Sequence, residues 1–209
     1  MSRESNTTQQ LVIRIQGGDA DAFNQLFMRY YPRIKLLVKL HMMDKLKARV
    51  EAEDVIQEIY IEVFKNFHKF EYRDPDSFYK WVVTVIGWKI KDLNKYHFRA
   101  AKRSGDDEVS MQRKGPGGET GTFEFANELD AGAGTPSQIV MEKEGYQMLE
   151  NAMKRLPLHF RRVICMRHLE QRSVQETAQV LDMTANAVNV LFHRAQQRLH
   201  ELLREMTYF

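Results

Sequence analysis

The sequence has 209 residues, of which 43% are hydrophobic and 28% charged, as is typical of a globular protein with one or two domains. Its formal net charge is only +3, so a nucleic-acid-binding surface has to come from local clusters of basic residues. A single cysteine, Cys165, excludes an internal disulfide. With a polar start and no long apolar run, we expect a cytoplasmic protein with neither a signal peptide nor membrane insertion.

Helical periodicity runs through nearly every segment and no strand alternation persists, so we predict an all-α fold. Apolar residues at 11–15 predict a short first helix that the glycines at 17–18 end. Asp19 is placed to cap a long amphipathic helix. Lys35 and Lys39 lie off its apolar stripe and are expected to be solvated. The stripe consists of Phe23, Leu26, Phe27, Tyr30, Ile34, Leu37 and Val38.

The next predicted helix, at 51–70, combines a broad apolar face with an acidic ridge. Asp54, Glu58 and Glu62 are four residues apart and therefore share one side of the helix. Such a ridge is either a docking surface for a basic partner or a solvated acidic face. A carboxylate metal site is set aside because no histidine of the chain has a glutamate three residues before it. The apolar face consists of Val55, Ile56, Ile59, Tyr60, Val63, Phe64 and Phe67.

A basic helix is predicted after the run at 74–77, where Pro75 lies near the first helical position. Between Lys80 and Arg103, seven basic residues face one acid, and Trp88, Tyr96 and Phe98 are interleaved with them. Cations along a phosphate backbone, together with rings on which unpaired bases stack, suit single-stranded or melting DNA. The alternative is a solvated helix end with favourable cations. The buried stripe is expected to be Phe78, Trp81, Val82, Val85, Ile86, Ile90 and Leu93.

Composition changes between Ser104 and Thr135, which hold seven of the eleven glycines and seven acids against two bases. We interpret 104–135 as a flexible acidic linker between two small helical domains, at 1–103 and 136–209. The second half shows helical periods broken at Leu156-Pro157, and Cys165 is expected to be a buried apolar residue. Five arginines there are candidates for phosphate contacts: Arg155, Arg161, Arg162, Arg167 and Arg172.

No arrangement of residues points to catalysis. The seven histidines are scattered without metal-ligand spacing, and no Ser/His/Asp or Cys/His set stands out. The glycine-rich run of the linker lacks the ending of a phosphate loop and follows no strand. We therefore predict no enzyme activity, no catalytic residues, no metal and no cofactor.

The stretch from Ser173 to Leu199 predicts a helix-turn-helix. Ser173 and Glu176 have the spacing of a capping box, and the turn at 181–183 contains Asp182, which tolerates left-handed backbone. Thr184 can cap the second helix. A short helix, a tight turn and a longer helix is the arrangement in which the second helix enters the major groove of DNA. An ordinary helical hairpin is the alternative.

With both halves in view, the chain resembles a bacterial RNA polymerase sigma factor of the extracytoplasmic-function type (ECF, sigma-70 family). Residues 19–34 look like the opening of sigma region two, and residues 53–70 look like its Asp-x-x-Gln-Glu helix. Residues 76–93 look like the helix that melts the promoter −10 element, and residues 156–199 look like region four, which reads the −35 element. The resemblance implies a transcription initiation factor whose partners are core RNA polymerase (its clamp and flap), promoter DNA and, commonly, an anti-sigma factor.

The resemblance also implies roles for individual residues, carried over by position. Asp54, Gln57 and Glu58 would contact core polymerase. Trp81 looks like a core tryptophan of the family. The −10 element would be contacted by Tyr72, Arg73, Lys80, Lys89 and Lys95. The −35 element would be contacted by Asn186, Asn189, His193 and, on phosphate, Arg194.

Some positions depart from the family's pattern. Lys89 stands where the family usually has asparagine, and Trp88 is bulkier than expected. On the recognition helix, Asn189 replaces a common basic residue, while Val190 and Leu191 lie where serine and arginine are usual. Because guanines are normally read by arginine or lysine, the usual −35 sequence is put in doubt. The linker is also longer than the family's short tether, which loosens the coupling between the domains.

The main alternative is a stand-alone helix-turn-helix regulator that binds DNA without polymerase. It leaves the acidic ridge and the basic helix without a role, and co-migration with core polymerase would separate the two functions. An enzyme acting on nucleic acid is a third class, tested by metal-dependent nuclease activity. A scaffold held by an inhibitory partner is a fourth, but its partner binding would not exclude a sigma factor, since factors of this type are commonly sequestered by an anti-sigma protein.

Overall fold

A computed structural model describes residues 3–42, 50–103 and 136–207, and within these ranges the chain forms helices and no strands. The predicted linker at 104–135 lies outside the described residues. The N-terminal helices are α1 (Arg3–Gln16), α2 (Ala20–Met42), α3 (Ala52–Asn66), the 3₁₀ turn η1 (Phe67–Lys69) and α4 (Ser77–Arg103). The C-terminal helices are α5 (Pro136–Arg155), α6 (Leu158–Ile164), the π-helical turn η2 (Cys165–Leu169), α7 (Val174–Leu181) and α8 (Ala185–Thr207).

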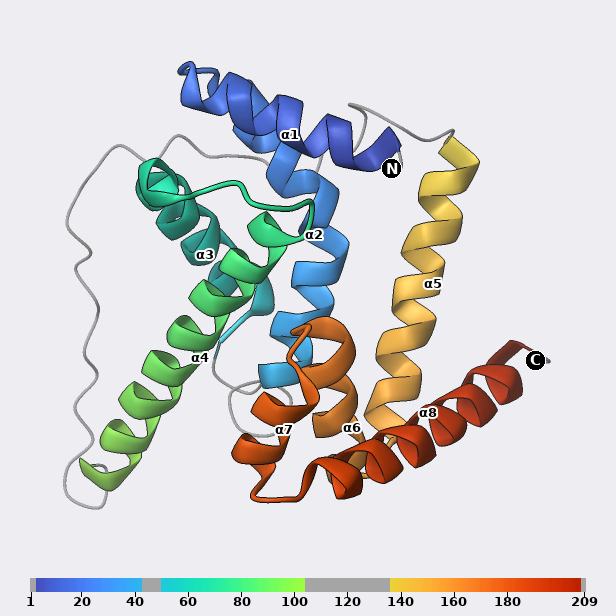
Figure 1. Cartoon of the computed structure of the whole chain (residues 1–209). Coiled ribbons are helices and arrows are strands. Elements are labelled where there is room, and N and C mark those ends of the chain that lie inside the picture. The colour runs from blue at the N-terminus through green and yellow to red at the C-terminus, as the bar shows by residue number, and fades with distance from the viewer. Residues whose placement is uncertain (1–2, 43–49, 104–135, 208–209) are drawn as a thin grey trace.

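Helix α2 is the centre of the arrangement. Figure 1 shows α1 across one end of it, α3 and α4 on one side, and α5 with the other C-terminal helices on the opposite side. The turn into α2 follows the sequence prediction, since Gly18 has φ +94° and the Asp19 carboxylate accepts a hydrogen bond from the Ala22 amide at 3.0 Å. Helix α1 begins earlier than predicted, and the Arg29 side chain of α2 ties it down by donating to Thr8 Oγ1 at 3.0 Å.

The predicted apolar stripes form the core of the N-terminal helices. On α2, Phe23, Leu26 and Phe27 are fully buried. Val55, Ile59 and Val63 of α3 are buried in the same cluster, with the first turns of α4. Trp81 is half-buried and stacks on Phe70 with the ring centroids 5.2 Å apart, as befits a structural tryptophan. Pro75 lies two residues before Ser77, where α4 begins, and so near the first helical position as predicted.

A second face of α2 packs against the C-terminal helices, which the sequence reading missed. Leu36 and Leu40, absent from the predicted stripe, are 3% and 5% exposed. Lys39, expected to be solvated, donates to the buried Glu150 of α5 at 2.9 Å. Lys35, also expected to be solvated, pairs with Glu53 of α3 at 2.8 Å. Both lysines lie beside apolar surface with a carboxylate in reach, which explains why they are not simply hydrated.

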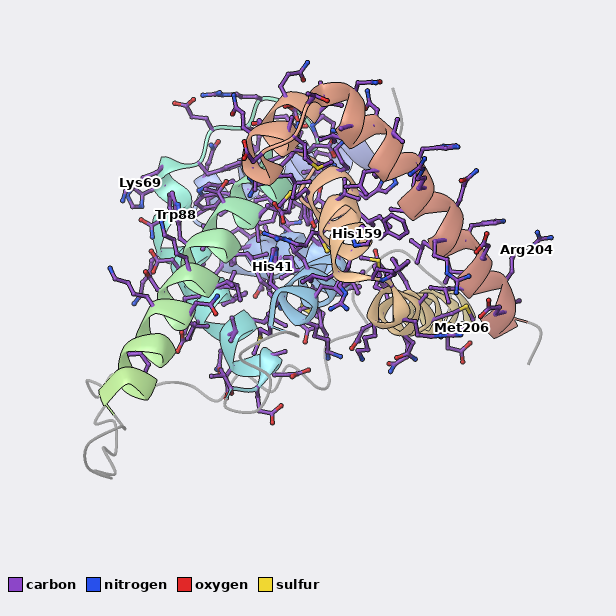
Figure 2. The ribbon with its side chains drawn as sticks, turned by 90° about the horizontal axis from the view of Figure 1, so that it is seen from below. His41, Lys69, Trp88, His159, Arg204 and Met206 are labelled. Atoms are coloured by element: carbon purple, nitrogen blue, oxygen red, sulfur yellow. The ribbon has the colours of Figure 1, made fainter. Side chains whose placement is uncertain are left out.

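Polar contacts complete this junction between the two sets of helices. Arg33 donates to the main-chain oxygen of His168 at 2.7 Å, and its guanidinium lies 3.9 Å from the ring centre of the buried Tyr79. His41 Nε2 is 3.1 Å from the buried Glu170 carboxylate, and the view from below in Figure 2 shows the exposed His41 near its centre. Burial alone would raise the pKa of Glu170, but contacts with His41 and Arg172 lower it below its ordinary value.

The local signals of the C-terminal helices are confirmed. Ser173 and Glu176 form both hydrogen bonds of a capping box at the start of α7. Asp182, with φ 52° and ψ 51°, ends that helix in the left-handed region. Thr184 Oγ1 accepts from the Ala187 amide at 3.2 Å and caps α8. Cys165 is buried as expected. The turn between α7 and α8 is therefore specified at both ends by local hydrogen bonds.

Replacing Ser173 by alanine is expected to lower the free energy of unfolding by about 1 kcal/mol, because α7 loses the acceptor for its Glu176 amide. Urea unfolding followed by circular dichroism measures the loss. Ser173→Asp is the matched control, since aspartate also caps helices well and should retain most of the stability. Equal losses in both variants would contradict a capping role.

Candidate nucleic-acid and protein-binding surfaces

The acidic ridge on α3 is exposed as the helical spacing predicts. Asp54, Gln57 and Glu58 all lie on the solvent side, because Val55 and Ile59 direct the opposite side of the helix into the core. These three side chains, on the first two turns of α3, form one short polar surface that is called the acidic strip below. Such a strip is available to a basic partner.

Two groups of predicted site residues meet at the edge of this strip. Lys89 of α4, predicted to contact DNA, forms an ion pair with Glu58 of α3, predicted to contact polymerase. Both side chains are partly exposed. Lys89 of α4 therefore lies at the edge of the acidic strip of α3. A partner that displaces either side chain breaks this ion pair and frees the other side chain. The sequence alone did not suggest that the two groups are paired.

The remaining basic candidates are accessible along α4. Lys80 lies 3.9 Å from Asp74, at the start of the helix, and Lys95 is exposed further along. Trp88 is 65% exposed and Tyr96 51% exposed. In Figure 2, Trp88 lies beside α4 at the outer edge of the molecule, near Lys69. Exposed rings interleaved with cations are the combination expected of a surface that stacks unpaired bases.

The loop before α4 holds Tyr72 and Arg73. Arg73 is exposed and pairs with Glu71 at 3.0 Å, while its amide donates to Ser77 Oγ at 3.3 Å. Tyr72 is half-buried and packs against the core, and this burial raises the pKa of its phenol. The loop is therefore anchored at Tyr72 and presents Arg73 to solvent. Lys80, in the first turn of α4, lies beside this loop through its contact with Asp74.

The predicted −35 residues lie together on α8. Asn186, Asn189, His193 and Arg194 are all exposed, whereas Val188 and Ala195 are fully buried against the other C-terminal helices. Leu191, one of the departures from the family's pattern, is half-buried and packs against the core. Leu191 therefore belongs to the packing side of the helix.

The five arginines predicted as phosphate contacts are mostly engaged within the protein. Arg155 pairs with Glu205, Arg161 donates to the Leu156 carbonyl and Arg172 pairs with Glu170. Arg167 lies over the Phe192 ring with its guanidinium 5.6 Å from the ring centre. The Arg155 and Arg167 contacts hold α8 against α5 and η2, while those of Arg161 and Arg172 are local, so most of the cluster is structural. Arg162 is exposed and stays a candidate for phosphate.

Within residues 3–42, 50–103 and 136–207, no group of three or more His, Cys, Asp or Glu side chains is arranged to hold a metal ion. In the same ranges, no helix has both the length and the apolar character that crossing a membrane requires.

Comparison with known proteins decides the family. The family model described as ECF sigma factor matches residues 5–205. The chain belongs to the ECF sigma factor family. It is 26% identical to the ECF RNA polymerase sigma-E factor of Escherichia coli strain K12 over 94% of each chain. It is 24% identical to the ECF RNA polymerase sigma-E factor of Haemophilus influenzae over 97% of this chain and 98% of the relative.

Two solved structures align with most of this ECF sigma factor. The sigma factor RpoE in complex with the anti-sigma factor NepR from Bartonella quintana aligns with a TM-score of 0.46 at 16% identity, over 87% of this chain and 96% of that one. CnrH in complex with the cytosolic domain of CnrY aligns with a TM-score of 0.45 at 20% identity, over 95% and 98%.

Proposed function

We propose that this ECF sigma factor binds core RNA polymerase through the acidic strip of α3 and directs it to promoters through α4 and α8. In this assignment, residues 1–103 bind polymerase and recognise and melt the −10 element, and residues 136–209 recognise the −35 element. Residues 104–135 link the two units. The proposed place of action is the cytoplasm, where polymerase and promoter DNA are found, and no enzyme activity is proposed.

The observation that carries the proposal is the family match over residues 5–205, which spans both exposed surfaces. The ion pair between Lys89 and Glu58 places α4 beside the acidic strip, which supports a factor that holds polymerase and DNA together. The C-terminal helices supply a second accessible helix, α8, for a second DNA element. An anti-sigma partner, which the resemblance implies, stays a prediction.

Reconstituted transcription tests this function. Purified core polymerase is mixed with the full chain on genomic fragments, and transcript start sites are mapped. We expect discrete starts that Asp54→Ala with Glu58→Ala removes, because the variant loses two carboxylates of the docking strip. Asp21→Ala with Glu144→Ala is the matched control, since it also removes two exposed carboxylates but leaves α3 intact.

The ion pair with Lys89 requires a second variant. Replacing Glu58 also frees Lys89, so a loss of transcription has two explanations. Lys89→Met breaks the same pair but keeps the carboxylate, and it is expected to retain binding to core polymerase in gel filtration. No starts combined with no binding to core would overturn the proposal and favour the stand-alone regulator.

A further inference from the structure

The exposed side of α8 carries an unusual set of side chains for a helix that reads DNA. Asn186, Asn189, Val190 and His193 are all exposed, and Val190 is 45% accessible although it is purely apolar. Between Thr184 and His193 the sequence contains no lysine and no arginine. The exposed side of the first turns of α8 therefore offers amides, an imidazole and two methyl groups.

The packing of α8 fixes which side chains face outward. At about 100° per residue, Asn186, Val190 and His193 lie within roughly 60° of one another and on the side opposite Val188. Val188 is fully buried, and Ala195 two turns later is too. The Thr184 cap and the left-handed Asp182 fix the start of the helix. Rotating α8 to present another side would expose this buried row, so the outward strip is an intrinsic feature of the fold.

Cations are displaced to the flank of this strip. Arg194 is the first basic residue of α8, about 100° around the helix from His193. Arg198, one turn on, is paired with Glu201 at 2.7 Å. A flanking arginine is suited to a phosphate rather than to a base edge at the centre of the groove. The side chains at the centre of the strip are therefore the ones that determine base preference.

The chemistry of the strip selects among base pairs. Asparagine matches the N6 donor and N7 acceptor of adenine with two hydrogen bonds, whereas guanine is typically read by arginine or lysine. An apolar side chain in the major groove gains by contacting the C5-methyl group of thymine. In the protein without DNA, by contrast, the water-exposed Val190 side chain contributes no favourable hydrophobic free energy.

We infer that α8 reads A·T base pairs in the upstream promoter element, with Asn186 and Asn189 on adenine edges and Val190 on the methyl group of a thymine. This inference rests on the proposed function and specifies its DNA substrate. The recognised element is thus defined by adenine amino groups and a thymine methyl group, with Arg194 on the adjacent phosphate.

The first test is a selection with the holoenzyme. Full chain and core polymerase transcribe a promoter pool in which the −10 element is fixed and the upstream element is randomised, and the transcribed templates are sequenced. We expect enrichment of adenine at the positions read by the two asparagines. Asn186→Ala and Asn189→Ala should each lower the preference at one position by about 5- to 150-fold, the discrimination of a bidentate contact. Asn189→Arg should shift the base preference at one position of the element from adenine toward guanine.

The second test isolates the methyl contact. Each thymine of the selected element is replaced by deoxyuridine, which lacks the C5-methyl group. We expect a loss of about four-fold in transcription at one position, the worth of one buried methyl-sized group. The loss should disappear in Val190→Ala. Val180→Ala is the matched control, because Val180 is equally exposed but lies on α7, and this variant should keep the deoxyuridine effect.

The outcomes separate this inference from the function on which it rests. Discrete starts with guanines enriched upstream, unchanged by either asparagine variant, would overturn the reading of A·T pairs and leave the sigma function intact. An equal deoxyuridine effect in the wild type and in Val190→Ala would overturn the valine contact. If no template of the pool gives a start, the proposed function fails and the inference fails with it.

Discussion

Replacing Phe23 by alanine is expected to lower the free energy of unfolding by about 3–5 kcal/mol. Phe23 is fully buried, and three rings pack edge-on against it: Tyr60 at 5.1 Å, Phe64 at 5.0 Å and Phe67 at 5.6 Å between centroids. Because rings from α3 and η1 enclose it, truncation leaves a cavity that a single side chain cannot refill. Against a typical total of about 5–15 kcal/mol, such a loss leaves the N-terminal helices close to unfolding.

Urea unfolding monitored by circular dichroism measures this loss, with Phe64→Ala as the comparison. Phe64 belongs to the same aromatic cluster but is 47% exposed, so its removal loses about half of the transfer free energy and leaves no enclosed cavity. Its loss should be less than half of that for Phe23. Similar losses for the two variants would show that burial of Phe23 does not dominate the stability of the cluster.

Local signals were sufficient to predict most of the helices and their buried sides. The apolar period of α3 identified Val55, Ile59 and Val63, because a helix buries whichever face carries its apolar residues. The capping box at Ser173 and the turn at Asp182 were predictable for a related reason, since each depends on hydrogen bonds within a few residues. Information of this kind is contained in a single stretch of sequence.

The junction between the two sets of helices depends on distant parts of the chain and was missed. Lys39 and Glu150 are 111 residues apart, and nothing near Lys39 in the sequence indicates a carboxylate partner. Leu36 and Leu40 were left out of the predicted stripe because they belong to a second face of α2, whose partners are α5 and η2. A helix with two buried faces has a weaker amphipathic signal, so only its broader face was recognised.

In the candidate site, too, local features were predictable from the sequence and contacts between helices were not. Exposure of Asp54, Gln57 and Glu58 followed from helical spacing. The pairing of Glu58 with Lys89 did not, because it depends on how α3 packs on α4. Likewise, the sequence placed Val190 and Leu191 together as departures from the family, and only the packing of α8 separates them into an exposed and a half-buried residue.

Replacing Leu40 by aspartate is expected to separate the C-terminal helices from α2 without unfolding either set. Leu40 is 5% exposed and lies one turn from the buried Leu36, on the face of α2 that packs against α5 and η2. Its neighbours in the chain, Lys39 and His41, pair with the buried Glu150 and Glu170. An ionised carboxylate introduced there has no partner cation, because Lys39 and His41 already pair with the two glutamates. Burying an unpaired carboxylate costs several kcal/mol. Opening the junction hydrates the new charge, whereas the core around Phe23 remains closed.

Small-angle scattering measures the separation. A compact chain of 209 residues has a radius of gyration of about 17 Å, and the variant should exceed this by several ångströms with its helical circular dichroism retained. Leu40→Met is the control, since it conserves volume and polarity and should stay compact. Because Phe23 is enclosed by rings of α3 and η1, the N-terminal helices are expected to keep this aromatic cluster once the junction opens. An unchanged radius in Leu40→Asp would mean that the polar contacts of Arg33, Lys39 and His41 hold the junction without the leucines.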